Sequence, residues 1–436
     1  MTQRQEVRVK WNCPALSSSL LHNPVYRLYY WHAEYPLKGD GYCMESLTKI
    51  RGLLPLLQPN QQTPTPQKNP LIDTTNNITA MEPPDIQEQP NDAPTALEPR
   101  PLTPENEKPR SNLDLISECD SFPSYTSNPA DYLKHIITYY HFQIASLPGV
   151  TLGYVLPSVA EVLRGLPSWT LNDEERTLTL TAGTNEQERS AAIAATTAGM
   201  RETGHFAVLK GWRNELYPVY GPGPLGHKSG GEPEVLFSIE RAASCLFGVV
   251  TYGIHMTAFV RQKNDDGEEE LKIWVPRRAR TKQTYGGMLD NTVAGGIATG
   301  EKPFESLVRE AAEEASLPES LVRKHAKAAG VVSYFYIRDE RAGGETKLLQ
   351  PEVQYIYDLE LPEDVTPKPS DDEVEEFYLW SVDEINGAMR KGEFKPNCAL
   401  VMLDFFVRHG VLTQENEKDF IEIASRLHRR LEFPTP

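Results

Sequence analysis

Three absences limit what this chain of 436 residues can be. No run of about 18 consecutive apolar residues occurs, so the sequence predicts no membrane-spanning helix. The five cysteines are widely spaced, odd in number and form no CxxC pair, which disfavours a disulfide framework or a zinc site and predicts reduced thiols. Positive charge is scarce, with a net charge of −17, and duplex nucleic acid needs a basic surface. A small anionic substrate remains compatible, because local Arg and Lys residues or a bound cation can reverse the sign inside one pocket.

The N-terminal region is rich in Pro, Gln, Asn and Thr, above all between residues 53 and 110. Too few apolar side chains are available there to offset the entropy of ordering, so residues 1–110 are predicted to be disordered. The first 33 residues carry four basic residues against one acidic residue, which has some likeness to a mitochondrial targeting segment but lacks a convincing amphipathic helix. The first expectation is therefore a cytoplasmic protein, with a mitochondrial location as the alternative. Met81 is a candidate for a later start, so it is open whether residues 1–80 belong to the mature protein.

Residues 111–247 are predicted to form a small α+β domain. Asn128 followed by Pro129 predicts the start of a helix. Five apolar residues continue it at helical spacing: Leu133, Ile136, Ile137, Tyr140 and Ile144. A second helix is expected over 188–200, two short strands around a turn over 205–221, and a strand with a helical turn over 236–248. No catalytic constellation is evident in this domain, and its role is open.

Residues 248–415 alternate strand and helix patterns, as in an α/β fold. The segment 248–278 predicts a long hairpin around the turn at 264–267. Alternating apolar residues predict one buried face of a later strand: Val353, Tyr355, Tyr357, Leu359 and Leu361. Residues 377–385 predict a strand that passes into a helix, and 399–410 predict a buried helix. Residues 416–436 are predicted to be a C-terminal amphipathic helix.

The stretch GGIATGEKPFESLVREAAEEASL, residues 295–317, crowds acidic residues onto one face of a predicted helix that starts at Pro303. The helix also has a wide apolar stripe that can pack on a sheet: Phe304, Leu307, Val308, Ala311 and Ala315. At about 100° per residue, Glu310, Glu313 and Glu314 share one arc, where like charges at i,i+4 cost a few tenths of a kcal/mol. Arg309 precedes Glu313 by four residues and can orient its carboxylate.

A divalent cation would remove this repulsion, since carboxylate oxygens suit Mg²⁺ or Mn²⁺. It would bridge the glutamates and the phosphate oxygens of a substrate, and lower the pKa of a bound water. The predicted metal ligands are Glu310, Glu313 and Glu314, followed by Glu301 and the carbonyl of Gly295. The alternative is a solvated acidic helix face, which is a common feature of proteins.

The spacing of this stretch resembles the Nudix box, the motif of hydrolases that act on diphosphates linked to another moiety. Gly295 is followed after five residues by Glu301, after seven more by Arg309-Glu310, and after two more by Glu313-Glu314. The resemblance implies an α/β fold: a Nudix α/β/α sandwich with a mixed sheet, preceded here by the small α+β domain and the disordered tail. One position departs from the motif, because Ser316 stands where the family has a Gly suited to a left-handed turn.

Further segments within 204–260 and 274–410 resemble one Nudix subgroup, which includes the Nudix portion of fungal thiamine pyrophosphokinase fusions and stand-alone fungal and plant enzymes. In that subgroup a domain of uncharacterised function precedes the Nudix domain. The resemblance implies hydrolysis of thiamine diphosphate, above all damaged forms such as oxothiamine and oxythiamine diphosphate, to the monophosphate and phosphate. This reaction would remove a damaged compound that could otherwise occupy thiamine-dependent enzymes. No kinase domain is expected after the last matched helix, so pyrophosphokinase activity is not assigned.

Two alternatives to this function stay open. Oxidised nucleoside diphosphates such as 8-oxo-dGDP are a second substrate class, because the box binds the diphosphate and the metal and does not select the organic group. A Nudix fold used only for binding or regulation is the third reading, disfavoured by the presence of every box carboxylate. The expected partner in all three is a small diphosphate molecule, with no nucleic acid or membrane, and the oligomeric state is open.

The remaining roles are assigned to residues outside the box. The general base is open between the helix glutamates and a later loop with Asp372, Glu373 and Glu375, which could equally be a solvated charge run. Three basic residues before the box are predicted to bind the diphosphate, because guanidinium forks match phosphate oxygens; a solvated basic turn is the alternative. They are Arg277, Arg278 and Lys282. Trp274, Tyr285 and Phe335 are candidates to stack on a ring, although such aromatics are more often core, and His255 is interpreted as structural.

Overall fold

The structure is a computed structural model that describes residues 108–222, 234–263, 267–370 and 372–436. The predicted disordered region, residues 1–110, lies outside the described residues except for its last three, as do Met81 and most of the turn predicted at 264–267. The described residues all belong to one compact unit, Leu102–Pro436.

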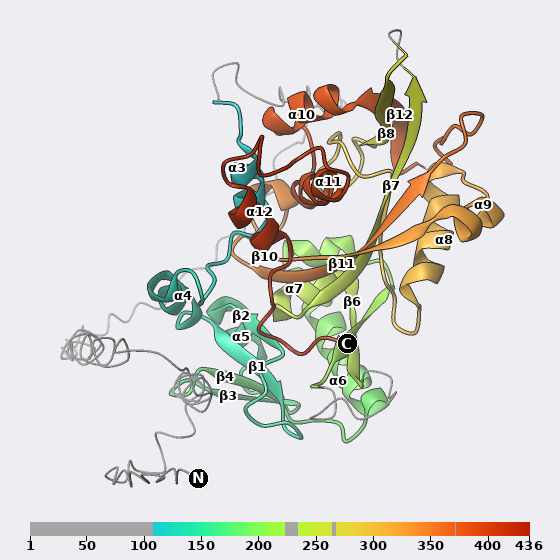
Figure 1. Ribbon diagram of the computed structural model, residues 1–436. Coiled ribbons are helices and arrows are strands. Elements are labelled where there is room, and N and C mark those ends of the chain that lie inside the picture. Colours follow the sequence, from blue (N-terminus) through green and yellow to red (C-terminus); the bar gives the residue numbers. More distant parts are fainter. Residues whose placement is uncertain (1–107, 223–233, 264–266, 371) are drawn as a thin grey trace, which may run out of the picture. The chain divides into compact units, whose positions relative to one another are not determined.

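The elements α4 to α7, here called the preceding domain, are drawn in cyan to green in Figure 1. Among the described residues its strands form a four-stranded sheet in the order β2-β1-β4-β3 and a separate β5-β6 pair. The strands are β1 (Tyr140–Ile144), β2 (Gly153–Val155), β3 (Trp169–Asn172), β4 (Thr177–Leu180), β5 (Leu216–Tyr220) and β6 (Val235–Glu240). The helices are α4 (Pro129–Ile136), α5 (Pro157–Leu163), α6 (Glu186–Glu202) and α7 (Ser244–Phe247), with 3₁₀ turns η3 (Ala207–Gly211) and η4 (Arg241–Ala243).

Two of the predictions for this domain are wrong. The helix capped by Asn128 ends at Ile136, and Tyr140–Ile144 is strand β1. Its buried and partly buried residues alternate, a pattern that fits a strand, and parallel pairing with β4 fixes it. Residues 207–211 form the 3₁₀ turn η3 instead of a strand, because Glu345 accepts hydrogen bonds from the first backbone N–H groups of this turn. The helix α6 and the strand with a helical turn at β6 and α7 are confirmed.

A mixed sheet is the centre of the second part, here called the sandwich domain. Within the described ranges, its six strands run in the order β10-β11-β7-β8-β12, with β9 paired to β7. They are β7 (Thr251–Lys263), β8 (Glu269–Arg278), β9 (Val293–Gly296), β10 (Lys327–Ile337), β11 (Leu349–Glu360) and β12 (Val374–Ser381). The sheet is mixed because β11 pairs in parallel with β7, whereas the other pairs are antiparallel.

Helices cover both faces of this sheet, which confirms the predicted α/β/α sandwich (Figure 1). One face packs against α8 (Pro303–Ala315) and α9 (Glu319–His325). The other face packs against α3 (Asn112–Cys119), α10 (Val382–Arg390), α11 (Pro396–Arg408) and α12 (Phe420–Leu427), and the 3₁₀ turn η5 (Glu340–Ala342) follows β10. The hairpin β7-β8, the strand β11, the transition from β12 to α10 and the buried helix α11 agree with the sequence predictions.

Both ends of the described chain differ from the sequence prediction. Helix α3, predicted to belong to the first domain, packs against α11 and α12 of the sandwich. The predicted C-terminal helix over 416–436 is confined to Phe420–Leu427. The segment after it is held instead by Asp120, whose carboxylate pairs with Arg426 at 3.2 Å and with Arg429 at 2.9 Å. This charged contact ties the C-terminal segment to the N-terminal one.

Candidate active site

Helix α8 ends in the left-handed turn for which the Nudix family has a glycine. Ser316 adopts φ 53° and ψ 29°, and its N–H donates to the carbonyl of Ala311. The next N–H, that of Leu317, donates to the same carbonyl at 3.1 Å. A residue with a Cβ pays about 1 kcal/mol or more for this conformation. The turn therefore forms with Ser in place of Gly, at an energetic cost.

Arg309 lies at the centre of the box carboxylates. Its Nε and Nη2 donate to the two oxygens of Glu301 at 2.9 and 3.1 Å. Its Nη1 donates to Glu310 at 2.9 Å and to Glu313 at 3.0 Å. One guanidinium thus fixes the orientation of three carboxylates, which agrees with the role predicted for Arg309.

Glu314 and Glu310 turn away from solvent, toward strand β9. The Glu314 carboxylate accepts a hydrogen bond from the N–H of Ala294 at 3.0 Å, and Glu314 is 8% exposed. Burial raises the pKa of Glu314 well above its ordinary value, and the charge of Glu310 adds to the rise. Glu310 packs directly on Gly295, where a Cβ would lie 2.2 Å from Oε1 of Glu310. Any larger residue at position 295 would displace the Glu310 side chain, so the strand backbone and this carboxylate lie in contact.

These donors fit a divalent cation of the magnesium type. Burial raises the pKa of Glu310 as well, although the guanidinium of Arg309 opposes the rise, so two neighbouring carboxyl groups hold raised pKa values. Such groups gain from a hard cation, because carboxylate and carbonyl oxygens are the ligands it prefers. The predicted ligands Glu310, Glu313, Glu314, Glu301 and the carbonyl of Gly295 therefore stay a chemically consistent set.

A different group of metal-ligating side chains lies nearby in the interior. Within the described part of the chain, His255, Asp290 and Cys398 alone form a trio with ligand atoms within 4.8 Å of one another. Asp290 accepts hydrogen bonds from Cys398 Sγ at 2.6 Å and from Arg278 at 2.5 Å. Burial raises the pKa of the Cys398 thiol well above its usual value, so the thiol stays protonated. The trio is satisfied internally and its acid already has a cation, so it offers little to a metal ion.

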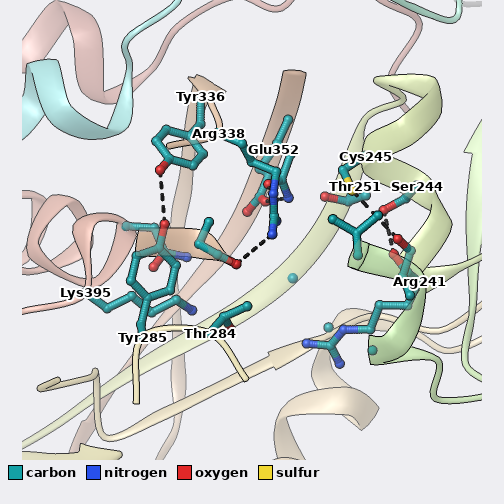
Figure 2. Close-up of a pocket in the computed structure, with 18 of the residues that line it drawn as sticks. Arg241, Ser244, Cys245, Thr251, Thr284, Tyr285, Tyr336, Arg338, Glu352 and Lys395 are labelled. Carbon is teal, nitrogen blue, oxygen red and sulfur yellow. Dashed lines mark hydrogen bonds between the residues drawn. The ribbon is translucent and has the colours of Figure 1, made fainter. Parts of the chain in front are cut away.

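A cavity of about 490 Å³ opens beside β9 (Figure 2). Ala294, Gly295 and Gly296 of the box line one part of it. Figure 2 shows Arg241 on one side and Lys395 with Tyr285 on the other, while Arg338 and Glu352 lie above. The cavity therefore joins the box strand to a wall of both charged and aromatic groups.

Family comparisons match both parts of the chain. A model described as the NUDIX domain matches residues 253–398, and one described as a domain of unknown function, DUF4743, matches residues 136–251. This chain belongs to the Nudix hydrolase family. It is accordingly an enzyme of the Nudix pyrophosphohydrolase type, and its preceding domain corresponds to the domain of unknown function.

The Nudix hydrolase has close relatives in yeast and plants. It is 37% identical over 334 residues to the uncharacterised protein YJR142W of Saccharomyces cerevisiae, an alignment of 74% of this chain and 92% of that protein. It is 37% identical over 245 residues to Nudix hydrolase 20, chloroplastic, of Arabidopsis thaliana, which covers 56% of this chain and 59% of the plant protein. The solved MutT protein from Methanosarcina mazei is 18% identical, with a TM-score of 0.26, over 38% of this chain and 96% of its own. Across the described ranges of the Nudix hydrolase, no helix combines the length and apolar character needed to cross a membrane.

The loop predicted to supply a general base to the Nudix site holds one carboxylate, that of Glu373, among basic side chains. Glu373 pairs with Lys282 and lies 3.5 Å from Arg213. Burial would raise the pKa of Glu373, but the hydrogen bond and charge of Lys282 bring it below its ordinary value. Glu375 instead lies 3.6 Å from Arg280 on the surface, and Asp372 is exposed. Glu373 is therefore the better placed of the predicted bases.

The residues predicted to bind the diphosphate have partners within the Nudix domain. Arg277 donates to the hydroxyl of Tyr378 at 3.1 Å and to the carbonyl of Gly287 at 2.9 Å. Arg278 pairs with Asp290, and Lys282 with Glu373. None of the three lines the cavity. Their role in phosphate binding stays a prediction that the geometry does not favour for Arg277 and Arg278.

The aromatic candidates and His255 divide between cavity and core. Tyr285 lines the cavity, and its hydroxyl lies 3.2 Å from that of Tyr336. Phe335 is fully buried and Trp274 packs against the core below α8. His255 also lines the cavity, but burial lowers its pKa to about 4, so it stays neutral with Nδ1 2.7 Å from Oδ1 of Asn291.

Sequence reasoning missed the part that the preceding domain plays at the Nudix site. Lys210, Arg213, Tyr217 and Arg241 come from η3, β5, η4 and the loop between them, and all line the cavity. In the sequence these four residues form no motif, because their spacing matches no known pattern of site residues. Only the packing of this domain against the Nudix domain brings them together.

Proposed function

We propose that this Nudix hydrolase cleaves the diphosphate of a small molecule whose heteroaromatic ring donates hydrogen bonds, foremost thiamine diphosphate and its oxidised forms, to the monophosphate and phosphate. The observation that supports this substrate class is the cavity of about 490 Å³, which runs from the box strand β9 to the carboxylate of Glu352. Cavities of this size hold ligands of drug-like dimensions. The diphosphate would lie at the box end, and the ring would lie at the Glu352 end.

At the box end, Glu310, Glu313 and Glu314 would hold Mg²⁺ or Mn²⁺, with the carbonyl of Gly295 and Glu301 as further ligands. When bound, the ion supplies neutralisation of phosphate charge and a lower pKa for a bound water. Arg309 keeps three of these carboxylates in place through its four hydrogen bonds to Glu301, Glu310 and Glu313. Without this guanidinium the carboxylates would repel and turn toward solvent.

Glu373 would accept the proton of the attacking water. Its carboxylate lies in the loop before β12, beside Lys282, whose ammonium group keeps it ionised and thus able to take a proton. Glu375 is the second candidate, and its contact with Arg280 places it nearer the surface. The helix glutamates Glu310 and Glu313 remain the alternative source of the base.

At the other end, Glu352 gives the cavity a preference for a ring that donates hydrogen bonds. Its carboxylate accepts from the hydroxyl of Tyr334 at 2.5 Å and from Nε2 of Gln354 at 2.8 Å. A carboxylate has about four acceptor positions, so amino N–H groups can be added. Thiamine offers an aminopyrimidine and a positively charged thiazolium ring, both of which suit a carboxylate. Tyr285 and Tyr336 provide flat apolar faces nearby.

The same carboxylate supports one second candidate, an oxidised guanine nucleotide such as 8-oxo-dGDP. Guanine presents two neighbouring N–H groups on one edge, which a single carboxylate can accept together. The neutral base lacks the positive charge of thiazolium, and this difference favours thiamine diphosphate and oxythiamine diphosphate, which keep that charge. A catalytically silent module is the remaining alternative.

Phosphate release by the purified full chain separates these functions. We expect Mg²⁺-dependent turnover with the highest kcat/KM for thiamine diphosphate, oxothiamine diphosphate or oxythiamine diphosphate, compared with 8-oxo-dGDP and ADP-ribose. Glu352→Gln should lower kcat/KM for the thiamine compounds about tenfold, since it removes a charge-assisted hydrogen bond. The exposed Glu340→Gln is the control. A higher kcat/KM for 8-oxo-dGDP would select the second candidate, and no release from any of the compounds would leave the silent module.

A further inference from the structure

The preceding domain contacts the box strand and the loop that follows it. The hydroxyl of Tyr217 packs on Gly296, where a Cβ would lie only 1.9 Å from its oxygen. Thr299 donates its N–H to the carbonyl of Leu216 at 2.8 Å and its hydroxyl to Ser238 at 2.9 Å. Strands β5 and β6 are therefore anchored on the loop between Gly296 and Glu301, inside the box itself.

A second anchor lies on the opposite side of the cavity. Glu345 of the Nudix domain accepts a hydrogen bond from the N–H of Val208 at 3.0 Å, in the turn η3. Gly344 packs so closely on this turn that a Cβ would lie 2.5 Å from Cγ1 of Val208. Leu348 is buried in the hydrophobic core of the preceding domain. With two anchors, the side chains that this domain presents to the cavity are held in fixed positions.

Arg241 is the residue of this domain best placed to meet a substrate. It begins η4 directly after β6, lines the cavity, and points into it from the right in Figure 2. Its Nη1 donates to Glu215 at 2.8 Å, and its guanidinium lies 5.6 Å from the ring centre of Tyr217. In the part of the chain that the structure describes, Nη1 is the only side-chain nitrogen of Arg241 with a hydrogen bond.

The charge of Arg241 acts on both catalytic regions of the Nudix domain. It interacts electrostatically with Glu310 of the box and with Glu373 of the later loop. Both carboxylates therefore lie within electrostatic range of the guanidinium. The side chain of Arg241 is 38% exposed and lines the cavity, so a ligand in the cavity can reach it.

We propose that Arg241 binds the diphosphate of the substrate, so that the domain of unknown function completes the Nudix active site. This inference rests on the proposed function, since it needs a diphosphate at the box. A guanidinium has five N–H donors in a fork that matches phosphate oxygens, and the nitrogens not engaged by Glu215 supply that fork. Arg277 and Arg278 have other partners, so Arg241 fills the role first assigned to them. Glu215 and Tyr217 are positioning residues that hold its side chain.

The test uses the full chain with Arg241→Gln and a matched control. Arg164 belongs to the same domain, pairs with Glu161 and Asp173 at 2.9 Å each, is 42% exposed and does not line the cavity. Arg241→Gln should raise KM for the diphosphate substrate about tenfold or more while kcat changes little, because a charge-assisted contact to the bound diphosphate is lost. Arg164→Gln should leave KM unchanged. Equal KM values for Arg241→Gln and the original protein would overturn the proposal.

A binding measurement separates this inference from the proposed hydrolysis. Calorimetry with imidodiphosphate, a P–N–P analogue, and Mg²⁺ should give a Kd about tenfold weaker for Arg241→Gln than for the original protein. If the original protein binds imidodiphosphate but releases no phosphate from any substrate, the proposed function fails and this inference stands. If both proteins bind it equally, this inference fails whatever the activity. Arg241→Lys keeps the charge without the fork and should lose about threefold in affinity. Should Arg241→Gln not fold, unchanged affinity in Arg241→Lys overturns the proposal.

Discussion

Glu314 of the box and the His255–Asp290–Cys398 trio are both buried metal-ligating groups beside β7 and β9, but their charges are balanced differently. Asp290, 5% exposed, pairs with Arg278 and accepts from Cys398. Glu314, 8% exposed, has a backbone N–H as its hydrogen-bond partner and the like charge of Glu310 as a neighbour. Burial is therefore no guide to a metal site by itself. What distinguishes the box is Glu314, which lies beside the like charge of Glu310 and has no ion pair of its own among the described residues.

The largest effect should come from breaking the compensated trio. Asp290→Ala leaves Arg278 buried without its partner, and breaking such a pair costs about 3–5 kcal/mol of folding stability. Urea unfolding of the full chain measures this loss. The exposed pair of Asp173 with Arg164 provides the control, since solvent screens it and Asp173→Ala should cost far less stability than Asp290→Ala. A similarly small loss of stability for Asp290→Ala would show that its pairing with Arg278 does not stabilise the fold.

Replacing Glu314 should impair activity without lowering the stability of the fold. Glu314→Gln should lower the rate of phosphate release about 100- to 1000-fold, by analogy with the loss of one electrostatic catalytic group. Its metal-free folding stability should not fall, because Gln still accepts from Ala294 and no longer repels Glu310. Glu305→Gln on the same helix, paired with Arg323 and 52% exposed, should change neither quantity appreciably. A Glu314→Gln protein with full activity, or one with greatly reduced stability, would contradict this view.

The neutral His255 in the trio predicts an acid-sensitive fold. Burial lowers the pKa of His255 to about 4, against about 6.5 in an unfolded chain. Between these values the unfolded state binds more protons, so the free energy of unfolding should fall as the pH drops from about 6.5 to 4, by up to roughly 3 kcal/mol. Urea unfolding at several pH values should show a flatter profile for His255→Gln. His141, whose burial also lowers its pKa to about 4, is present in both proteins, so their difference isolates His255. Parallel profiles would show that His255 does not titrate in this way.

The smallest effect concerns the end of the box helix. Ser316→Gly should raise the free energy of unfolding by about 0.5–1 kcal/mol, because glycine adopts the left-handed conformation without strain but loses more entropy on folding. Activity should stay the same, since Ser316 is neither a predicted metal ligand nor a predicted catalytic residue. Thermal unfolding of Ser316→Gly and Ser316→Ala gives the comparison. A less stable glycine variant would show that the serine side chain makes up for its backbone strain.

The sequence predicts features that depend on neighbouring residues better than features that depend on distant segments. The helix Pro303–Ala315 and its glutamates follow from spacing within one helix, where neighbours in sequence are neighbours in space. Tyr140–Ile144 fits helical and alternating patterns equally, and its pairing with β2 and β4 decides for a strand. Local pattern is therefore sufficient for the box and insufficient for short strands.

The predicted phosphate ligands show the second limit. Arg277 and Arg278 were assigned from charge and nearness to the box in sequence, but Tyr378 and Asp290 occupy them. Arg241 lies some way earlier in the chain, in a domain without a recognisable site, and reaches the cavity only through the docking of Tyr217 and Thr299. Contacts between domains leave no periodic trace in a single sequence.

Uptake of magnesium by the full chain tests the central claim, that the box glutamates need a divalent ion. Calorimetric titration with Mg²⁺ in the presence of imidodiphosphate should show binding by the original protein and by Glu305→Gln. Glu314→Gln should bind Mg²⁺ at least about tenfold more weakly, because it lacks one ionised ligand. No uptake by the original protein, or equal uptake by Glu314→Gln, would contradict the claim.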